Sequence, residues 1–164
     1  MLRRFSNACQ LMKMLLIFTA IVVAIILLAG VVLGIKSQQM PLLGLLDGHL
    51  RPCPESPNCV SSETEKEDAL HYIAPFPAGD SKAWASLVTA IESLGGHIAT
   101  NDGQYLHATF ISTLFRYVDD VEARQDVGAK VIQLRSASRV GRSDFGANRK
   151  RIETLRRALP DIVR

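Results

Sequence analysis

The sequence predicts an α+β protein: an N-terminal transmembrane helix followed by a single domain with an antiparallel sheet and helices on one face. Three observations lead to this class. Residues 14–35 carry no charged side chain, two pairs of extended segments each flank a short turn, and amphipathic helices precede and follow these segments. Consecutive hairpins with helices packed on one side define the α+β class. The expected order in the domain is strand, helix, four strands, helix.

The apolar segment 14–35 is long enough to cross a membrane. As a helix it spans about 33 Å, against a hydrocarbon core about 30 Å thick. Arg3, Arg4 and Lys13 precede it and Lys36 follows it. This excess of positive charge on the N-terminal side predicts a cytoplasmic N-terminus, because positive flanks stay in the cytoplasm.

The chain is therefore expected in the inner (plasma) membrane, with a single pass and a periplasmic or otherwise extracytoplasmic domain. Residues 1–13 form a cytoplasmic tail, residues 14–35 a signal anchor, residues 36–46 a juxtamembrane linker and residues 47–164 the domain. A cleaved signal peptide is the alternative. Its apolar core normally has about 7 to 15 residues, shorter than this run, so the uncleaved anchor is favoured.

The charge balance argues against nucleic-acid binding. The chain has 19 basic and 16 acidic residues. Without the four basic residues that flank the apolar segment, 15 basic residues face 16 acidic ones, a net charge of −1. The domain thus lacks the overall basic footprint of nucleic-acid-binding proteins.

Two cysteines beyond the apolar segment predict a disulfide. Cys53 and Cys59 lie close together in a proline-rich loop, on the side of the membrane where disulfides persist. A metal site completed by His49, His71 or His107 is the alternative, but the cysteine spacing differs from that of the usual zinc knuckle. We therefore expect no metal and no cofactor.

The first half of the domain is expected to contain a strand and a helix. Residues 69–76 alternate and end at Pro75-Phe76-Pro77, which predicts a strand. Asp80 is placed to cap the next helix, and Gly95-Gly96 to end it. Its apolar residues recur at helical spacing and are Trp84, Leu87, Val88, Ile91 and Leu94.

Two hairpins follow. The first joins residues 97–100 to 104–112 through Asn101-Asp102-Gly103, a sequence that suits a tight turn. The second joins residues 115–124 to 130–138. If its turn centres on Val127, Asp119 faces Arg135 across the strands and forms an ion pair.

The end of the domain is expected to be a buried strand (131–138), a polar loop (139–143) and an amphipathic helix (144–159). One stripe of this helix carries Phe145, Ile152, Leu155 and Leu159, which are expected to be buried. Asn148 lies on the same stripe. A polar side chain that faces a core is usually a hydrogen-bonded structural group, so the same reading applies to Asn148 and to Arg135.

Three motifs carry a family resemblance: C-P-E-S-P-N-C-V-S-S at 53–62, D-D-V-E at 119–122 and R-S-A-S-R-V-G-R-S-D-F-G-A-N-R-K-R-I at 135–152. Together they resemble the bacterial and plastid domain-of-unknown-function family numbered fourteen ninety-nine, over about residues 44–159. The resemblance implies no reaction or ligand. The signature positions that it implies are Cys53, Pro54, Pro57, Asn58, Cys59, Asp119, Asp120, Glu122, Arg135, Ser136, Ser138, Arg139, Gly141, Asp144, Gly146, Asn148 and Arg151.

The leading functional hypothesis is a membrane-anchored binding or interaction module for an anionic envelope ligand or an envelope protein. Guanidinium groups and the free amides at a helix start both suit anions. The predicted ligand-binding residues are Arg135, Ser136, Arg139, Arg142, Asp144, Asn148 and Arg151.

Two other classes stay open. An envelope hydrolase or transferase would draw its acid and base from Asp119, Asp120, Glu122 and His107. Against it, adjacent residues of a strand point to opposite faces, so Asp119 and Asp120 are not expected to form a close carboxylate pair. The third class is a structural subunit of an envelope complex, in which the arginine and aspartate motifs hold the fold together.

Overall fold

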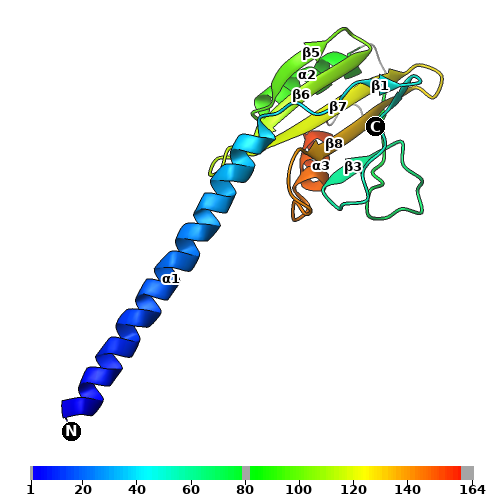
Figure 1. Cartoon of the computed structure of the whole chain (residues 1–164). Helices are drawn as coiled ribbons and strands as arrows, with labels where there is room; N and C mark the ends of the chain where they lie inside the picture. The colour runs from blue at the N-terminus through cyan, green and yellow to red at the C-terminus, as the bar shows by residue number, and fades with distance from the viewer. Residues whose placement is uncertain (1, 79–81, 160–164) are drawn as a thin grey trace.

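A long helix projects from an α+β domain (Figure 1). The structure is a computed structural model that describes residues 2–78 and 82–159. Helix α1 (Leu2–Ser37) is a single rod, and its stretch Gln10–Ser37 is long and apolar enough to cross a membrane by length and composition. Side chains of this stretch are exposed except near its end, where Gly30, Gly34 and Ser37 are buried against the domain. The predicted fold class is confirmed.

The domain is built on a six-stranded antiparallel sheet. Its strands run in the order β3-β8-β7-β6-β5, and β4 pairs with another part of β8. Their bounds are β3 (Cys59–Ser61), β4 (Phe76–Pro77), β5 (His97–Asn101), β6 (Tyr105–Ile111), β7 (Val118–Asp126) and β8 (Val131–Ser138). A separate two-stranded ribbon consists of β1 (Leu45–Leu46) and β2 (His49–Leu50).

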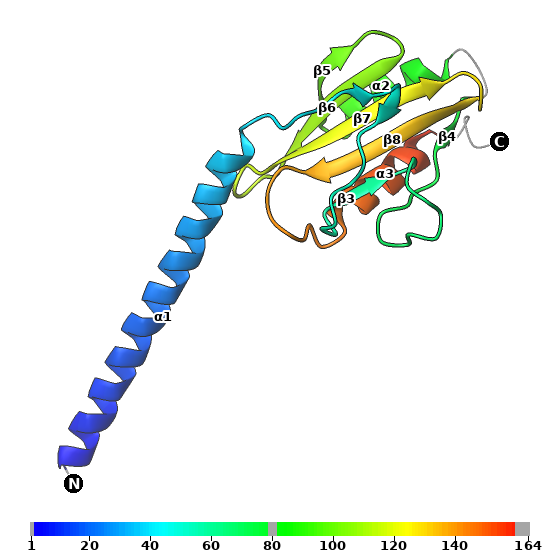
Figure 2. The ribbon, with the colours of Figure 1, turned by 45° about the vertical axis from the view of Figure 1, so that its right-hand side comes forward.

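Helices α2 (Ala83–Ser93) and α3 (Ala147–Ala158) cover one face of the sheet, as predicted (Figure 2). The core lies between this face and the helices, where alternate strand residues meet the apolar stripe of each helix. Its most buried members include Leu87, Ile91, Leu106, Val121, Leu134, Ile152 and Leu155. Gly95, with φ of 84°, ends α2 by donating its N–H to the Glu92 carbonyl. The predicted cap Asp80 lies outside the described residues.

The other face of the sheet is covered by chain that directly follows α1. We call residues 38–50 the strap. Figure 2 shows this segment crossing the sheet on the side away from α2 and α3. The Gly44 N–H donates to the Glu122 carboxylate (2.9 Å), and Leu50 is buried. The expected juxtamembrane linker, residues 36–46, therefore contacts the sheet through Gly44.

The Cys53–Cys59 disulfide is present, as predicted. It closes the proline-rich loop that leads from the strap into β3. Asn58 fixes the same loop to the far end of β8, because its amide donates to the Gly141 carbonyl (2.7 Å). The bridge and this hydrogen bond together set the local shape of the loop.

The strand expected at residues 69–76 is wrong except at Phe76, which belongs to β4. The Asp68 carboxylate accepts hydrogen bonds from the backbone N–H groups of Leu70 and His71, both at 3.2 Å. Such an aspartate turn offers the backbone an alternative to a sheet ladder. Residues 69–75 therefore form no strand, and one isolated β-bridge, between Ser61 and Tyr72, links them to the sheet.

The register expected for the second hairpin is also wrong. The last pair is Asp126 with Val131, so the turn has four residues and Lys130 takes a φ of 55°. This register places Arg135 opposite Glu122, and Asp119 opposite Ser138. The expected Asp119–Arg135 ion pair does not form.

Phe145 was expected in the core, but it is 98% exposed. Helix α3 begins at Ala147, two residues later, so helical periodicity does not apply to Phe145. Its φ of 53° and that of Gly146 at 80° turn the chain just before the helix. The other three predicted stripe residues, Ile152, Leu155 and Leu159, are buried.

Candidate functional site

Three charged residues of β7 point toward the strap. Asp120, Glu122 and Arg124 alternate with core residues, so they share one face of the strand. Asp120 is 2% exposed and Glu122 is fully buried. We call these three residues the ionic row. Burying charges is costly unless each is paired and hydrogen-bonded, so their partners decide what the row does.

Asp120 is held by an arginine and a histidine. The Arg139 guanidinium binds both carboxylate oxygens, with Nε at 2.8 Å and Nη2 at 2.7 Å. His107 Nε2 lies 2.8 Å from Oδ1. Arg139 Nη1 also donates to the carbonyls of Ser37 (3.3 Å) and Gln38 (3.4 Å). Arg139 thus joins the sheet to the end of α1.

Glu122 has three partners. Arg135 Nη1 donates to Oε2 (2.9 Å), and the Tyr105 hydroxyl (2.7 Å) and the Gly44 N–H (2.9 Å) donate to Oε1. Arg135 Nε is the one buried side-chain nitrogen or oxygen of the described residues without a hydrogen-bond partner. The carboxylate is therefore matched by one cation and two neutral donors.

Arg124 completes the row through Glu63, which lies just beyond β3. Arg124 Nε donates to Glu63 Oε1 (3.0 Å), and Arg124 Nη2 pairs with the same oxygen. His49 Nδ1, in the strap, lies 2.9 Å from that oxygen as well. Arg124 also pairs with Asp126 at 3.2 Å. Each member of the ionic row is thus paired within the chain.

The environment shifts the pKa values of Asp120, Glu63 and Tyr105 on this face of the sheet. Burial raises the pKa of Asp120, but hydrogen bonds from Arg139 and His107 outweigh it and leave the pKa below its ordinary value. Burial likewise raises the pKa of Glu63, and Arg124 and His49 lower it below the ordinary value. Burial, and then Glu122, raise the pKa of Tyr105 far above its ordinary value. At neutral pH Asp120 and Glu63 are ionised, and the Tyr105 hydroxyl stays protonated and donates a hydrogen bond to Glu122.

These shifts predict an acid-sensitive domain. Because the folded pKa of Asp120 lies below the unfolded one, about 3.9, the group stabilises the fold above that pH. The stabilisation is lost as the pH falls through the folded pKa. We expect the urea midpoint of the full chain in detergent to fall as the pH is lowered from about 5 to about 2. This fall should be steeper than the one measured for Asp120→Asn.

The exposed carboxylate Glu67 supplies the matched control for this measurement. Glu67→Gln is expected to retain the steep acid limb of the parent chain. Equal slopes for the parent and Asp120→Asn would show that the pairing of Asp120 contributes nothing to acid stability.

A second polar layer lies on the helix side of the sheet, around the buried Asn148 of α3. Its Nδ2 lies 2.9 Å from the Asn58 carbonyl, 2.9 Å from Ser138 Oγ and 2.8 Å from Asp144 Oδ2. Its Oδ1 accepts from Ser136 and Arg151, both at 2.6 Å. We call this the Asn148 network.

Arg151 extends the Asn148 network to β7. Its Nη2 donates to Asp119 Oδ2 (2.6 Å), and its guanidinium carbon lies 4.8 Å from the centre of the Phe110 ring. The network thereby ties α3 to β6, β7 and β8, and the reading of Asn148 as a hydrogen-bonded structural residue agrees with its geometry.

The predicted ligand-binding residues do not meet at one place. Arg135 and Arg139 lie beneath the strap, whereas four others belong to the Asn148 network on the opposite face: Ser136, Asp144, Asn148 and Arg151. Arg142 belongs to neither layer and is exposed. The assignment of these seven residues to a ligand stays a prediction, and the geometry separates Arg142 from the rest.

The catalytic candidates are split in the same way. Asp119 faces α3, while Asp120, Glu122 and His107 face the strap, as strand alternation predicted. His107 and Asp120 form an acid–base pair. However, both are buried, and Arg139 occupies both oxygens of Asp120, so a substrate reaches them only if the chain that covers them moves away. A catalytic role for these residues stays a prediction.

Sequence reasoning missed one member of the ionic row, Arg124. It also missed four residues around the row: Ser37, Gly44, Glu63 and Tyr105. One signal was available. Asp120, Glu122 and Arg124 alternate with apolar residues in a predicted strand, and three charges on one sheet face require either water or partners. The sequence does not say which segment supplies the partners.

The β8–α3 loop, residues 139–146, presents an exposed tip on a fixed base. Asn58 holds the Gly141 carbonyl, and Asp144 accepts from the N–H groups of Gly146 (3.0 Å) and Asn148 (2.7 Å). The Phe145 and Arg142 side chains are exposed. The loop lies at the end of the sheet where α1 joins, as Figures 1 and 2 show.

The fold and these polar layers define an α+β domain with buried internal ion pairs, joined to a long apolar helix by hydrogen bonds from Arg139. The chain belongs to the family described as "Protein of unknown function (DUF1499)", whose model matches residues 49–159. The match begins within the strap and ends at the last described residue of the domain. The comparison with curated proteins gives no match.

Proposed function

We propose that this protein is a single-pass membrane-anchored module that binds anionic phospholipid headgroups through the tip of its β8–α3 loop. In this proposal α1 spans the membrane with its N-terminus in the cytoplasm, and the domain is extracytoplasmic. The apolar length of α1, the positive residues before it and the Cys53–Cys59 disulfide support this placement.

The joint between α1 and the domain supports a fixed orientation at the membrane. The Val118 N–H donates to Ser37 Oγ (3.2 Å), and Gln38 donates to the Arg116 carbonyl (2.8 Å). Arg139 adds its bonds to the carbonyl of Ser37, at the end of α1, and to that of Gln38, the next residue. These bonds hold the end of the sheet that carries the β8–α3 loop next to the C-terminal end of α1.

The observation that carries the proposal is the exposure of both Phe145 and Arg142 in the loop at this end. Phe145 is 98% exposed although its loop is fixed at the base. Arg142 is exposed and has no hydrogen-bond or ion-pair partner among the described residues. An exposed aromatic ring and an exposed guanidinium in one loop suit the membrane interface, where the ring enters the headgroup layer and the cation meets phosphate.

The experiment places a tryptophan at the loop tip. In the full chain, Trp84→Phe removes the single native tryptophan and Phe145→Trp introduces the probe. In nanodiscs that contain anionic phospholipid we expect the emission of the probe to shift to the blue. Adding Arg142→Glu should weaken this shift, since one basic side chain at an anionic surface contributes about 1 kcal/mol, roughly a fivefold change in the equilibrium.

The matched control is Val127→Trp, because Val127 is 81% exposed and lies in the β7–β8 turn at the opposite end of the sheet. Its emission should not respond to the lipid. If the emission at position 145 is the same in anionic and zwitterionic discs, or the same as at position 127, the proposed headgroup binding is wrong.

A further inference from the structure

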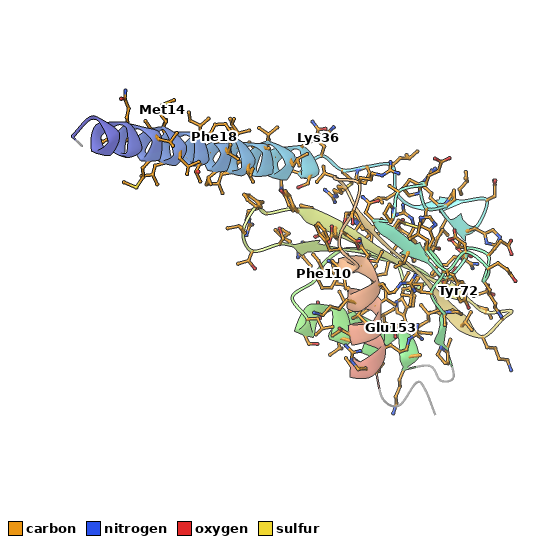
Figure 3. The ribbon with its side chains drawn as sticks, turned by 90° about the horizontal axis from the view of Figure 1, so that it is seen from below. Met14, Phe18, Lys36, Tyr72, Phe110 and Glu153 are labelled. Carbon is orange, nitrogen blue, oxygen red and sulfur yellow. A yellow bond between two sulfur atoms is a disulfide. The ribbon has the colours of Figure 1, made fainter. Side chains whose placement is uncertain are left out.

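The second loop at the membrane end of the sheet packs directly on α1. Residues 112–117, the β6–β7 loop, lie beside the last turns of the helix (Figure 3, near Lys36). A Cβ added to Gly30 would lie 2.5 Å from the Phe115 ring, and one added to Gly34 would overlap the Phe115 carbonyl oxygen. These glycines therefore let the loop approach the helix at van der Waals distance.

The loop is held in one conformation. The Ser112 N–H donates to the Tyr117 carbonyl, and the Tyr117 N–H donates to Ser112 Oγ, both at 2.8 Å. The rings of Phe115 and Tyr117 stack with centres 5.5 Å apart. Arg116 takes a φ of 59°, and its carbonyl accepts from Gln38. The Leu114 and Arg116 side chains of this loop remain exposed.

The position of the loop along α1 determines its depth relative to the apolar part of the helix. Gly30 lies six residues before Lys36, the first charge after the apolar run, which is roughly 9 Å along the helix. Phe115 reaches Gly30, so its ring lies alongside a part of the helix that is apolar on every side. Met14 and Phe18 project from the same helix further from the domain, with no chain around them (Figure 3).

The exposed side of the loop continues the apolar surface of the helix. Leu114 is 78% exposed and Ile111 is 45% exposed. Leu114 and Phe115 border a groove of about 390 Å³ together with Val31 and Ile35 of α1. Arg116 lies at the edge of the same groove with its side chain exposed.

We infer that the β6–β7 loop is a membrane-inserting element that places Leu114 among the acyl chains of the outer leaflet and Arg116 at the phospholipid phosphates. The inference rests on the proposed anchoring by α1, but not on headgroup binding by Arg142 and Phe145. Because Phe115 is docked on the helix, insertion of Leu114 does not depend on anionic lipid. It differs in this respect from the contact at Phe145.

The test measures the depth of single tryptophans in nanodiscs whose acyl chains are brominated. The full chain with Trp84→Phe carries the probe at Leu114, at Phe18 within the anchor, or at Val127 as the surface control. We expect the probe at position 114 to be quenched in zwitterionic and anionic discs alike, several-fold more than that at position 127. The probe at position 18 should be quenched in both lipids.

Two outcomes overturn the inference and are distinguishable. Quenching at position 18 without quenching at position 114 leaves the anchor in place and removes loop insertion. The absence of quenching at both positions removes the anchoring itself, and with it the proposed function.

A helix substitution tests the docking that the inference depends on. Gly34→Leu fills the space that the Phe115 carbonyl occupies, so it should displace the loop and reduce quenching at position 114. Ala29→Leu, at an exposed position of the same helix, should leave quenching unchanged. Unchanged quenching in Gly34→Leu would show that the packing of Phe115 on α1 does not place Leu114 in the bilayer.

Discussion

Replacing Arg135 with methionine is expected to lower the free energy of unfolding by about 3 to 5 kcal/mol, the usual cost of removing one partner of a buried ion pair. Glu122 is fully buried, and Arg135 is its cation at 2.9 Å. Without Arg135 the carboxylate retains only the neutral donors Tyr105 and Gly44. Urea unfolding of the full chain in detergent, followed by far-UV circular dichroism, measures the change.

Arg142→Met supplies the control, since Arg142 is exposed and unpaired among the described residues. Its effect is expected within about 0.5 kcal/mol, as for most surface substitutions. The double variant Glu122→Gln/Arg135→Met should be more stable than Arg135→Met alone. It leaves no unpaired charge at this position, and the glutamine oxygen can still accept from Tyr105 and Gly44. Equal stability of Arg135→Met and Arg142→Met would show that the Glu122–Arg135 pair does not hold the fold.

The elements that could be predicted from the sequence are those with a local signal. The charge-free run predicted α1, the periodicity from Leu87 to Ile91 predicted α2, and Asn101-Asp102-Gly103 predicted the first hairpin turn. The disulfide followed from two cysteines six residues apart in a loop. In each case neighbouring residues alone determine the structure.

The second hairpin shows where local signals mislead. Gly128 suggested a turn centred near Val127, whereas the chain turns through residues 127–130 with Lys130 in the left-handed region. A lysine there gives no sequence signal, because the glycine that would mark the conformation stands two residues earlier. The change of register moved Arg135 from Asp119 to Glu122 and so changed which carboxylate it neutralises.

The strap could not be predicted for a different reason. Gly44 contributes a backbone N–H to Glu122, and Ser37 and Gln38 contribute carbonyls to Arg139. Every residue except proline has both backbone groups, so composition does not reveal them. The arginine and aspartate motifs therefore resembled an open anion site in the sequence, while in the structure most of their charges pair with one another across two faces of the sheet.

The second large effect is expected at Asn148. Asn148→Leu keeps a side chain of similar size but should lower the free energy of unfolding by about 2 to 4 kcal/mol. Ser136 and the Asn58 carbonyl lose a buried partner, and each unsatisfied buried group costs about 1 to 3 kcal/mol. Arg151 loses one of its three acceptors, Asn148 Oδ1, and keeps Asp119 and Ser136.

Lys150→Leu, an exposed position of α3, is the control and should change stability by less than about 0.5 kcal/mol. Hydrogen exchange distinguishes local from global effects. Because Asn148 fixes Asp144 and the Asn58 loop, its loss should speed exchange in residues 139–146 more than in β6. Unchanged exchange in this loop, together with unchanged stability, would mean that the rigid base beneath Phe145 does not depend on Asn148. The base would then rest on the Asn58–Gly141 contact and on the bonds that Asp144 accepts from backbone N–H groups.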